Sequence, residues 1–337
     1  MMSTNKELRE RMVALATGKL VTKPLYVAAY LGLPDRLADR PTTAASLASE
    51  TGTQPEALYR LLRALASVGI FQEDEVGRFS TAPLGDLVRD RPGSLRPLVL
   101  WMNDPRHDRL WEDLLHSVRT GETAAPRAVG KPFWEYLDSE PELRSAFNAC
   151  MSTNAAAMHA AAVAAYDFGD EGVVVDVGGG EGALLESILQ SRAGLRGILF
   201  DRPPVVEQAR RRLGAPGLAE RCEVIGGDFF QQVPDGDTHV MSHIIHDWDD
   251  AQALRLLRNC YGACRGGGRV VLVEMIVPPG NAPSFAKLLD MEMLVMAGGR
   301  ERTEAEYRDL LTAAGYGQIR IVQSRGPAAV IEGIKSL

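Results

Sequence analysis

The chain has 337 residues and carries 37 Lys and Arg against 44 Asp and Glu, which gives a formal net charge of −7. Its composition, 45% hydrophobic and 24% charged residues, is that of an ordinary globular protein. At about 150 residues per domain the length predicts two domains, and the acidic balance argues against nucleic acid as the main partner.

The N-terminal segment and the cysteines exclude further classes of protein. The first residues are polar and charged, which is not typical of a signal peptide. No window of 18 or more apolar residues is present, so no membrane span is expected. Among the four cysteines, Cys260 and Cys264 are the closest pair, and they lack the second pair or the spaced histidine of a zinc site. We therefore expect reduced thiols in a cytoplasmic protein.

Residues 1–165 are predicted to be almost entirely helical. Apolar residues recur at helical spacing over 13–33, and Gly32 and Pro34 are expected to end that helix. A short helix with a hydroxyl cap is predicted over 42–52, and a longer one over 56–68. The segment 70–79 is predicted to form a small hairpin.

This order of helix, turn, helix and hairpin is that of a winged helix, which can bind DNA. The longer helix carries only Arg60 and Arg63 as basic residues, beside Glu56, and this is a thin surface for phosphate. Its apolar stripe is wide enough to pack against a partner chain. A role in dimerisation, or as a lid over a substrate, is therefore favoured over DNA binding.

From Val173 onward, short apolar runs alternate with amphipathic segments. The runs predict strands at 173–177, 198–200, 223–225, 240–245 and 270–274, and the segments predict helices at 181–192, 203–213 and 249–263. Such alternation is typical of a doubly wound parallel sheet, an α/β fold. The chain is therefore divided into a helical domain, 1–165, and a ligand-binding α/β domain, 166–337.

A glycine-rich segment joins the first of these strands to the helix that follows. Gly178, Gly180 and Gly182 have the spacing G-x-G-x-G, and glycine permits both the tight turn and the close approach of a ligand to the backbone. Dehydrogenases use a related loop, so the glycines alone do not identify the ligand. Asp176 lies two residues before the first glycine, where a carboxylate favours an ammonium group over a pyrophosphate.

Acidic residues also follow the next two strands. Asp201 ends the second apolar run, where a carboxylate can accept hydrogen bonds from a ribose diol; NAD and S-adenosylmethionine both carry this diol. Asp228 and Phe229 follow the third strand and are candidates to bind the amino group and the ring of adenine. The alternative for this pair is a plain turn. Asp176, Asp201 and Asp228 lie at or just beyond the ends of three successive predicted strands. This regular placement favours a nucleotide-binding site over a plain turn.

The fourth strand leads to the candidate catalytic base, His246. It lies at a strand-to-helix corner, on the edge of the sheet that lines the ligand crevice in open α/β folds. A histidine there can accept a proton near neutral pH. The alternative is a capping histidine, or a core histidine bonded to a carbonyl, and His239 and His243 are better placed for those roles.

Several acids accompany this histidine. Asp247, Asp249 and Asp250 could bind a metal, but acids at a helix start more often stabilise the helix dipole. We therefore predict no metal, and we expect Asp249 or Asp250 to cap the helix. Glu274 ends the fifth strand, and Glu301 precedes a helix predicted over 303–314; either could orient an imidazole. An ion pair with Arg300 or Arg302 is the alternative for Glu301.

Six segments in this order and spacing resemble one family: VDVGGGEG, LFDRPPVV, GGDFF, HIIHDWDD, VVLVEM and GGRERTEAEYRDLL. The chain is similar over nearly its whole length to the S-adenosylmethionine-dependent small-molecule O-methyltransferases. This group is typified by plant caffeate O-methyltransferases, and the chain is closer still to the antibiotic-tailoring enzymes of bacterial aromatic-polyketide pathways. The resemblance implies a Rossmann-like doubly wound domain preceded by a helical, winged-helix-like dimerisation domain.

The resemblance also implies roles for individual residues. The cofactor S-adenosylmethionine would be held by Asp176, Gly178, Gly179, Gly180, Asp201, Asp228, Phe229 and Ser242. Plant members commonly have lysine at the position of Ser242, and serine supplies no positive charge. The catalytic residues would be His246, Glu274 and Glu301. The acceptor would contact Trp101, Phe147, Asn148, Met151, Asp247, Met293 and Met296, although the aromatic and methionine side chains are more often plain core.

The predicted protein is thus a homodimer that methylates a hydroxyl of a small aromatic natural product. A phenol with a pKa near 10 would lose its proton to His246 as its oxygen attacks the sulfonium methyl. Two alternatives stay open. The same fold and cofactor could serve hydroxylation or decarboxylation, and the helical domain could make the chain a winged-helix regulatory protein.

Overall fold

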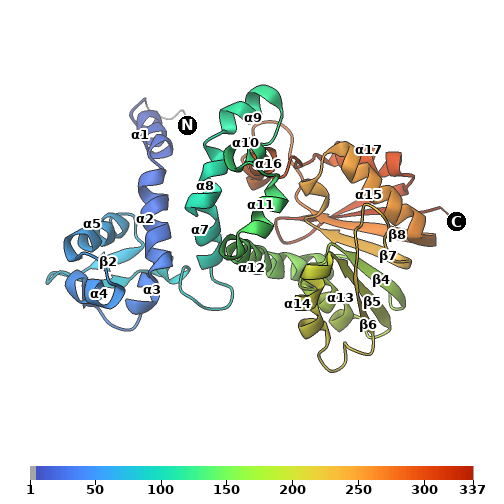
Figure 1. Cartoon of the computed structure of the whole chain (residues 1–337), viewed down its shortest axis with the longest axis horizontal. Helices are drawn as coiled ribbons and strands as arrows, with labels where there is room; N and C mark the ends of the chain where they lie inside the picture. The colour runs from blue at the N-terminus through green and yellow to red at the C-terminus, as the bar shows by residue number, and fades with distance from the viewer. Residues whose placement is uncertain (1–4, 337) are drawn as a thin grey trace. The chain divides into compact units, whose positions relative to one another are not determined.

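A computed structural model describes residues 5–336 of the chain (Figure 1). The chain divides into two compact units. The N-terminal unit contains the residues up to Arg109 together with Glu140–Thr153, and the sheet unit contains Leu110–Ser139 together with the residues from Asn154 onward. Within 5–336, no helix combines the length and the apolar character that crossing a bilayer requires.

The N-terminal unit is helical with one small sheet. Its elements are α1 (Asn5–Ala16), α2 (Lys19–Tyr30), α3 (Leu33–Arg36), β1 (Thr42–Thr43), α4 (Ala44–Thr51), α5 (Pro55–Ala66), β2 (Phe71–Glu73), β3 (Arg78–Thr81), α6 (Pro83–Asp86), α7 (Arg96–Met102), α8 (Pro105–Trp111) and the first half of α12 (Pro141–Ala165). The last two residues of α8 already belong to the sheet unit.

The winged-helix order is confirmed, since α4 and α5 are followed by the β2–β3 hairpin. The predicted cap is confirmed too, because the Thr43 hydroxyl accepts a hydrogen bond from the Ser46 amide. The single helix predicted over 13–33 is wrong. It breaks after Ala16, near Gly18, a residue of low helix propensity. Past Gly32, which has a φ of 63°, the short α3 begins, because proline is tolerated in a first helical turn.

The core of this unit leaves α1 uncovered. Buried leucines and aromatic residues of α3, α4, α5 and the hairpin, with Leu62 and Phe79 at zero exposure, form one cluster. No residue of α1 is buried. Its apolar side chains Leu8, Met12 and Leu15 are all exposed, which leaves an apolar face that a helix of a folded protein normally covers.

The sheet unit follows an α/β order. Its helices are α9 (Leu114–Thr120), α10 (Ala125–Val129), α11 (Phe133–Ser139), α13 (Ala183–Ser191), α14 (Pro203–Leu213), η1 (Ile245–Asp247), α15 (Asp250–Ala263), α16 (Phe285–Val295) and α17 (Glu304–Ala314), and its strands are β4 (Gly172–Val177), β5 (Leu195–Asp201), β6 (Cys222–Gly226), β7 (Gly236–Ser242), β8 (Cys264–Glu274), β9 (Gly317–Gln323) and β10 (Ala329–Ile334).

The strands form one seven-stranded sheet in the order β6-β5-β4-β7-β8-β10-β9. The five predicted strands pair in parallel, which confirms the doubly wound fold. The expectation of a parallel sheet throughout is wrong at one edge, because β10 runs antiparallel to both β8 and β9. Only the short segment 324–328 joins β9 to β10, and so short a connection permits an antiparallel pair alone.

Successive residues of β4 face opposite sides of the sheet, as the period of a strand requires. Val174 packs with α13 residues such as Ile188 in one core cluster, and Val175 packs with Leu256 of α15 in another. Figure 1 shows α15 and α17, which contact each other, along the sheet. With helices on both faces, the carboxyl edge of the parallel strands remains for a ligand.

The boundary between the compact units is not the single division after residue 165 that the sequence predicted. The segment Leu110–Ser139 groups with the sheet unit. The reason is bonding to α16: the Trp111 indole N–H donates to Glu292 at 2.7 Å, and the Ala124 amide donates to the Val295 carbonyl at 3.0 Å.

Candidate active site

The glycine loop follows β4 at the carboxyl edge of the sheet. Gly178, Gly180 and Gly182 have φ angles of 73°, 57° and 83°, a left-handed region that glycine adopts without strain. Gly179 has no such φ, but a Cβ there would lie 2.6 Å from Oδ2 of Asp176. Backbone conformation or packing therefore explains why each of these four positions is glycine. As a result, the loop exposes its backbone, with no side chains at these positions in the way of a ligand.

Asp176 lies in β4, two residues before the first glycine of this loop. Its side chain is 1% exposed, and burial raises the pKa of its carboxyl to about 7. Oδ2 has no hydrogen-bond partner among the described residues. The sequence predicted a carboxylate directed at an ammonium group. The structure packs the carboxyl against Gly179 and leaves one acceptor atom unsatisfied within the described residues.

Asp201, at the end of β5, bonds to the same loop. Its Oδ2 accepts the Gly180 amide at 2.8 Å, and its Oδ1 accepts the Arg202 amide at 2.6 Å. Burial raises the pKa of this carboxyl, and the two amides oppose that shift. Asp201 thus fixes the loop, and each oxygen keeps a further lone pair for a ligand.

Asp228 and Phe229 lie in a turn after β6, which was the alternative for this pair. Oδ1 of Asp228 accepts the Phe230 amide at 2.9 Å, and the carboxylate is exposed. The Phe229 ring is half-buried and meets the Trp248 ring edge-on, with 5.9 Å between centroids. The pair thus lies in a turn, and its carboxylate and its aromatic ring come from adjacent residues.

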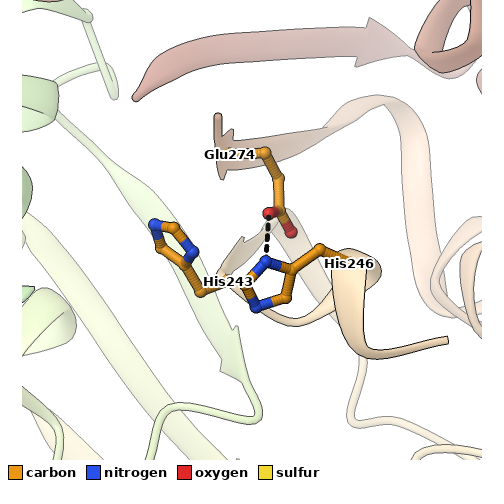
Figure 2. Close-up of side chains that lie close together, drawn as sticks. All are labelled: His243, His246 and Glu274. Atoms are coloured by element: carbon orange, nitrogen blue, oxygen red, sulfur yellow. Dashed lines mark ion pairs between the residues drawn. The ribbon is translucent and has the colours of Figure 1, made fainter. Parts of the chain in front are cut away.

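His246 forms the centre of a buried cluster. It lies in η1, just beyond β7, and its Nδ1 is 2.7 Å from Oε1 of Glu301. Oε2 of Glu274, from the end of β8, lies 3.9 Å from the same nitrogen, the contact drawn dashed in Figure 2. Nε2 faces Oδ1 of Asp247 at 3.6 Å, which is beyond hydrogen-bond range.

The charges in this cluster favour a protonated imidazole. Burial alone disfavours the cation, but Asp247, Glu274 and Glu301 outweigh it and raise the pKa of His246 to about 10. Burial also raises the pKa of Glu274 to about 7 and that of Asp247 to about 6, and the imidazole opposes both shifts. The neutral form that can accept a proton is thus the minor form near pH 7.

Backbone contacts fix the turn that carries His246. Oε1 of Glu274 accepts the amides of Ile244 and Ile245 at 3.1 and 2.9 Å. The Arg300 amide donates to the carbonyl of His246 at 2.8 Å. A Cβ on Gly299 would overlap that carbonyl oxygen, so only glycine fits there.

The alternative for Glu301, an ion pair with a neighbouring arginine, is wrong. Arg302 pairs with Asp250 at 2.7 Å and Arg300 with Asp250 at 3.4 Å. The buried Arg302 also donates to the carbonyls of Ile245 and Trp248, at 3.0 and 2.9 Å. Arg302 is thus a structural residue of the site that the sequence did not reveal; its only signal was its place in the motif beside Glu301.

The other two histidines along this part of the chain, His239 and His243, have different hydrogen-bond partners. His239 bonds to the Pro234 carbonyl at 2.9 Å, as expected of a core histidine. His243 has no such carbonyl partner within residues 5–336. Its Nε2 lies 2.8 Å from Sδ of Met158, and burial holds its pKa well below the usual value. Asp249 caps α15 as predicted, because its side chain accepts the Gln252 amide.

Three side chains of this cluster could in principle hold a metal. Ligand atoms of His243, His246 and Glu274 lie within 4.8 Å of one another, and Figure 2 shows the two imidazoles next to the carboxylate. The His246 nitrogen that faces Glu274 is hydrogen-bonded to Glu301. A metal ligated there would have to displace that hydrogen bond.

The residues predicted to bind the acceptor lie in both units. In the N-terminal unit, Trp101 is buried against the rings of His107 and Phe147, with 4.7 and 5.0 Å between centroids. Asn148 is half-buried and Met151 is exposed. In the sheet unit, Met293 and Met296 are both buried. Trp101 is therefore packed core within its unit.

Ser242 ends β7, and its hydroxyl lies 3.0 Å from Nε2 of His159, on α12. Burial lowers the pKa of His159 to about 4, so this imidazole is neutral. The sequence did not single out His159, because nothing in a helix sequence shows which strand it will meet.

Comparisons with known proteins agree with this fold and site. Residues 111–317 match the O-methyltransferase domain, and residues 13–89 match the O-methyltransferase dimerisation domain. The phenazine O-methyltransferase PhzM of Lysobacter antibioticus is 41% identical over 95% of this chain and 94% of its own.

Two solved structures are also similar. The mitomycin 7-O-methyltransferase MmcR has a TM-score of 0.93 and 36% identity, with 98% of each chain covered. The neocarzinostatin O-methyltransferase NcsB1, solved with S-adenosyl-L-homocysteine and 1,4-dihydroxy-2-naphthoic acid, has a TM-score of 0.81 and 34% identity, covering 94% of this chain and 96% of its own. The dimerisation and catalytic domains, the cluster around His246 and these relatives lead to one conclusion: the chain belongs to the O-methyltransferase family.

Proposed function

We propose that this chain transfers a methyl group from S-adenosylmethionine to a hydroxyl of a small aromatic natural product. The main observation that supports this proposal is the His246–Glu301 pair. In this pair a buried imidazole is hydrogen-bonded to a carboxylate at 2.7 Å, next to the glycine loop. A Cβ on Gly178 would meet the Ile244 side chain, so the loop and the base are neighbours. NcsB1 was solved with a flat phenolic acid, which supports an aromatic acceptor.

The residues of the loop fit the cofactor. Gly178, Gly179 and Gly180 would hold its methionyl end, where Asp176 keeps an unsatisfied buried oxygen. Asp201 would accept the ribose hydroxyls with its remaining lone pairs. Asp228 would accept the adenine amino group, and Phe229 would stack on the ring. When bound, the cofactor supplies the methyl group and the positive charge of a sulfonium.

His246 would act as the general base. Because Glu301 accepts the Nδ1 proton, Nε2 keeps the lone pair that removes the proton of the acceptor hydroxyl. Glu301 then stabilises the imidazolium that forms. Glu274 bonds to the backbone of the turn, so it orients the base and adds a second negative charge. The methyl transfer itself is an in-line displacement whose rate depends mainly on positioning.

The raised pKa of His246 constrains this scheme. A base must be neutral to accept a proton, whereas the surrounding carboxylates favour the cation. A positive charge bound nearby opposes a second cation and lowers the pKa of His246. The neutral base would therefore be more populated in the loaded enzyme.

The remaining assignments concern the acceptor and a second copy of the chain. We assign acceptor contacts to Phe147, Asn148 and Met151 in the N-terminal unit, and to Asp247, Met293 and Met296 in the sheet unit; Trp101, which is packed core, is left out. The N-terminal unit would join two copies into a homodimer, because it matches a dimerisation domain and leaves the apolar face of α1 exposed. Cys222, Cys260 and Cys264 form no disulfide with another described residue, and we propose that they are thiols in a reducing, cytoplasmic compartment.

A screen of phenolic acceptors with methyl-labelled S-adenosylmethionine tests this proposal. Mass spectrometry should find a product that carries the labelled methyl group on oxygen. The His246→Ala enzyme should bind S-adenosylhomocysteine normally but turn over about 10²-fold more slowly or worse. Label on nitrogen or carbon, a hydroxylated or decarboxylated product, or full turnover by His246→Ala would overturn the proposal. Salt-dependent DNA binding without cofactor binding would instead favour a regulatory protein.

A further inference from the structure

His159 and Ser242 form a polar pair at the carboxyl edge of the sheet, outside the cluster around His246. Asp176 of β4 and Val240 of β7 are register partners, so Gly178 and Ser242 lie at equivalent positions two residues further along. The pair thus borders the glycine loop. The imidazole of His159 is only 9% exposed, and its Nδ1 has no hydrogen-bond partner among the described residues.

The unsatisfied nitrogen indicates which tautomer His159 adopts. A neutral imidazole carries its proton on one nitrogen, and the other nitrogen is an acceptor. A buried N–H donor without a partner is rarer in proteins than an under-satisfied acceptor. The proton is therefore assigned to Nε2, where it is donated to Ser242 Oγ over 3.0 Å. The Ser242 hydroxyl hydrogen is then free to be donated elsewhere.

We propose that His159 is a positioning residue for the cofactor: it fixes the Ser242 hydroxyl as a neutral donor to the carboxylate of the methionyl group. The inference rests on the proposed function, which places the methionyl end beside Gly178. Serine supplies no positive charge, so the bond to this carboxylate would be made by a neutral donor chain. A serine hydroxyl without a fixed partner rotates freely, and fixing it on the carboxylate costs conformational entropy. A bond from His159 would reduce this cost.

Isothermal titration with two ligands tests this inference without turnover. S-adenosylhomocysteine contains the carboxylate, whereas 5′-methylthioadenosine lacks the whole amino-acid group. His159→Phe should weaken S-adenosylhomocysteine about five- to tenfold, since a hydrogen bond to a charged group is involved. It should leave 5′-methylthioadenosine within twofold. His159→Gln, whose side-chain amide can place a donor near the former Nε2, should restore most of the affinity, and His159→Asn should not.

A double mutant separates the possible failures. In a Ser242→Ala background, His159→Phe should cause no further loss beyond twofold, because its effect passes through Ser242. Additive losses, or equal losses for both ligands, would overturn the inference. The inference would also be overturned if Ser242→Ala weakens the binding of S-adenosylhomocysteine but His159→Phe leaves it unchanged. If neither variant changes that affinity, Ser242 itself leaves the cofactor site and the residue assignment under the proposed function fails. Thermal melting shows whether each variant is folded.

Discussion

Nδ1 of His246 lies 2.7 Å from Oε1 of Glu301, a hydrogen bond between residues 55 positions apart. It joins the turn after β7 to the loop before α17. The Glu301 amide in turn donates to Asp290 of α16 at 2.8 Å. The orientation of the imidazole therefore depends on three separate parts of the chain, and several measurable consequences arise from this dependence.

Glu301→Gln should shift the pH dependence of methylation. Activity requires neutral His246 and so rises as pH increases through the pKa of His246. Glu301 is one of the carboxylates that raise this pKa, so removing its charge should move the acid limb of kcat/KM to lower pH, by about one unit. The plateau should fall about tenfold because the imidazolium is less stabilised. The check is a pH–rate profile from pH 5 to 10.

The matched control is Glu304→Gln, an exposed acid on α17 that pairs with Arg308. Its profile should equal that of the wild type. An unmoved acid limb in Glu301→Gln would show that Glu301 does not set the pKa of the base.

Gly299→Ala should impair turnover more than cofactor binding. The added Cβ would overlap the His246 carbonyl oxygen, so η1 must move and the Arg300–His246 hydrogen bond lengthens. We expect kcat to fall tenfold or more, since small displacements of a base are costly, with the affinity for S-adenosylhomocysteine within about threefold. Gly262→Ala, where a Cβ meets nothing within 4 Å, is the control. Equal kcat in both variants would contradict this account.

Asp201→Ala should weaken binding of S-adenosylhomocysteine about tenfold or more, because it removes the carboxylate that accepts the Gly180 amide and that is proposed to accept the ribose diol. Asp201→Asn should have an intermediate effect. In the wild type the affinity should fall as pH decreases through the raised pKa of Asp201. Calorimetry would measure all three. Glu223→Ala, an exposed acid on β6, should bind normally; an Asp201→Ala affinity equal to it would remove Asp201 from the ribose.

Asp176→Asn should stabilise the protein in a pH-dependent way. The folded pKa of about 7 lies above the usual aspartate value of about 3.9. The wild type therefore loses stability as pH rises from about 4 to 7, because the carboxyl must ionise in the core. The gain in unfolding free energy should be small near pH 4 and greatest above pH 7, at most about 4 kcal/mol. Urea unfolding at pH 4, 6 and 8 would measure it, and a gain that does not vary with pH would refute the cause. Weaker S-adenosylhomocysteine binding by the same variant would support contact with the ammonium group.

The sequence by itself determined the α/β fold, the winged-helix order and the glycine loop, because these depend on local periodicity and on glycine spacing. It also singled out His246 as the candidate base, since a strand-to-helix corner is visible in sequence. The tertiary structure alone decided which residues meet there. That Glu301 pairs with His246 and Arg302 with Asp250 depends on how α16 and α17 pack on the sheet, and local sequence does not encode such long-range pairing.

The difference between local sequence and long-range packing also explains which other features the sequence did not predict. The antiparallel β10 was missed because the turn before it sets its direction, not its own composition. The position of Asp176 just before the glycine loop was visible in the sequence, but only packing against Gly179 put its carboxyl in the core. His159 had no signal in the sequence at all, because its chemistry exists only where α12 crosses the end of β7. Residue spacing reveals elements and motifs, whereas burial and distance, which decide charge and proton position, exist only in the folded chain.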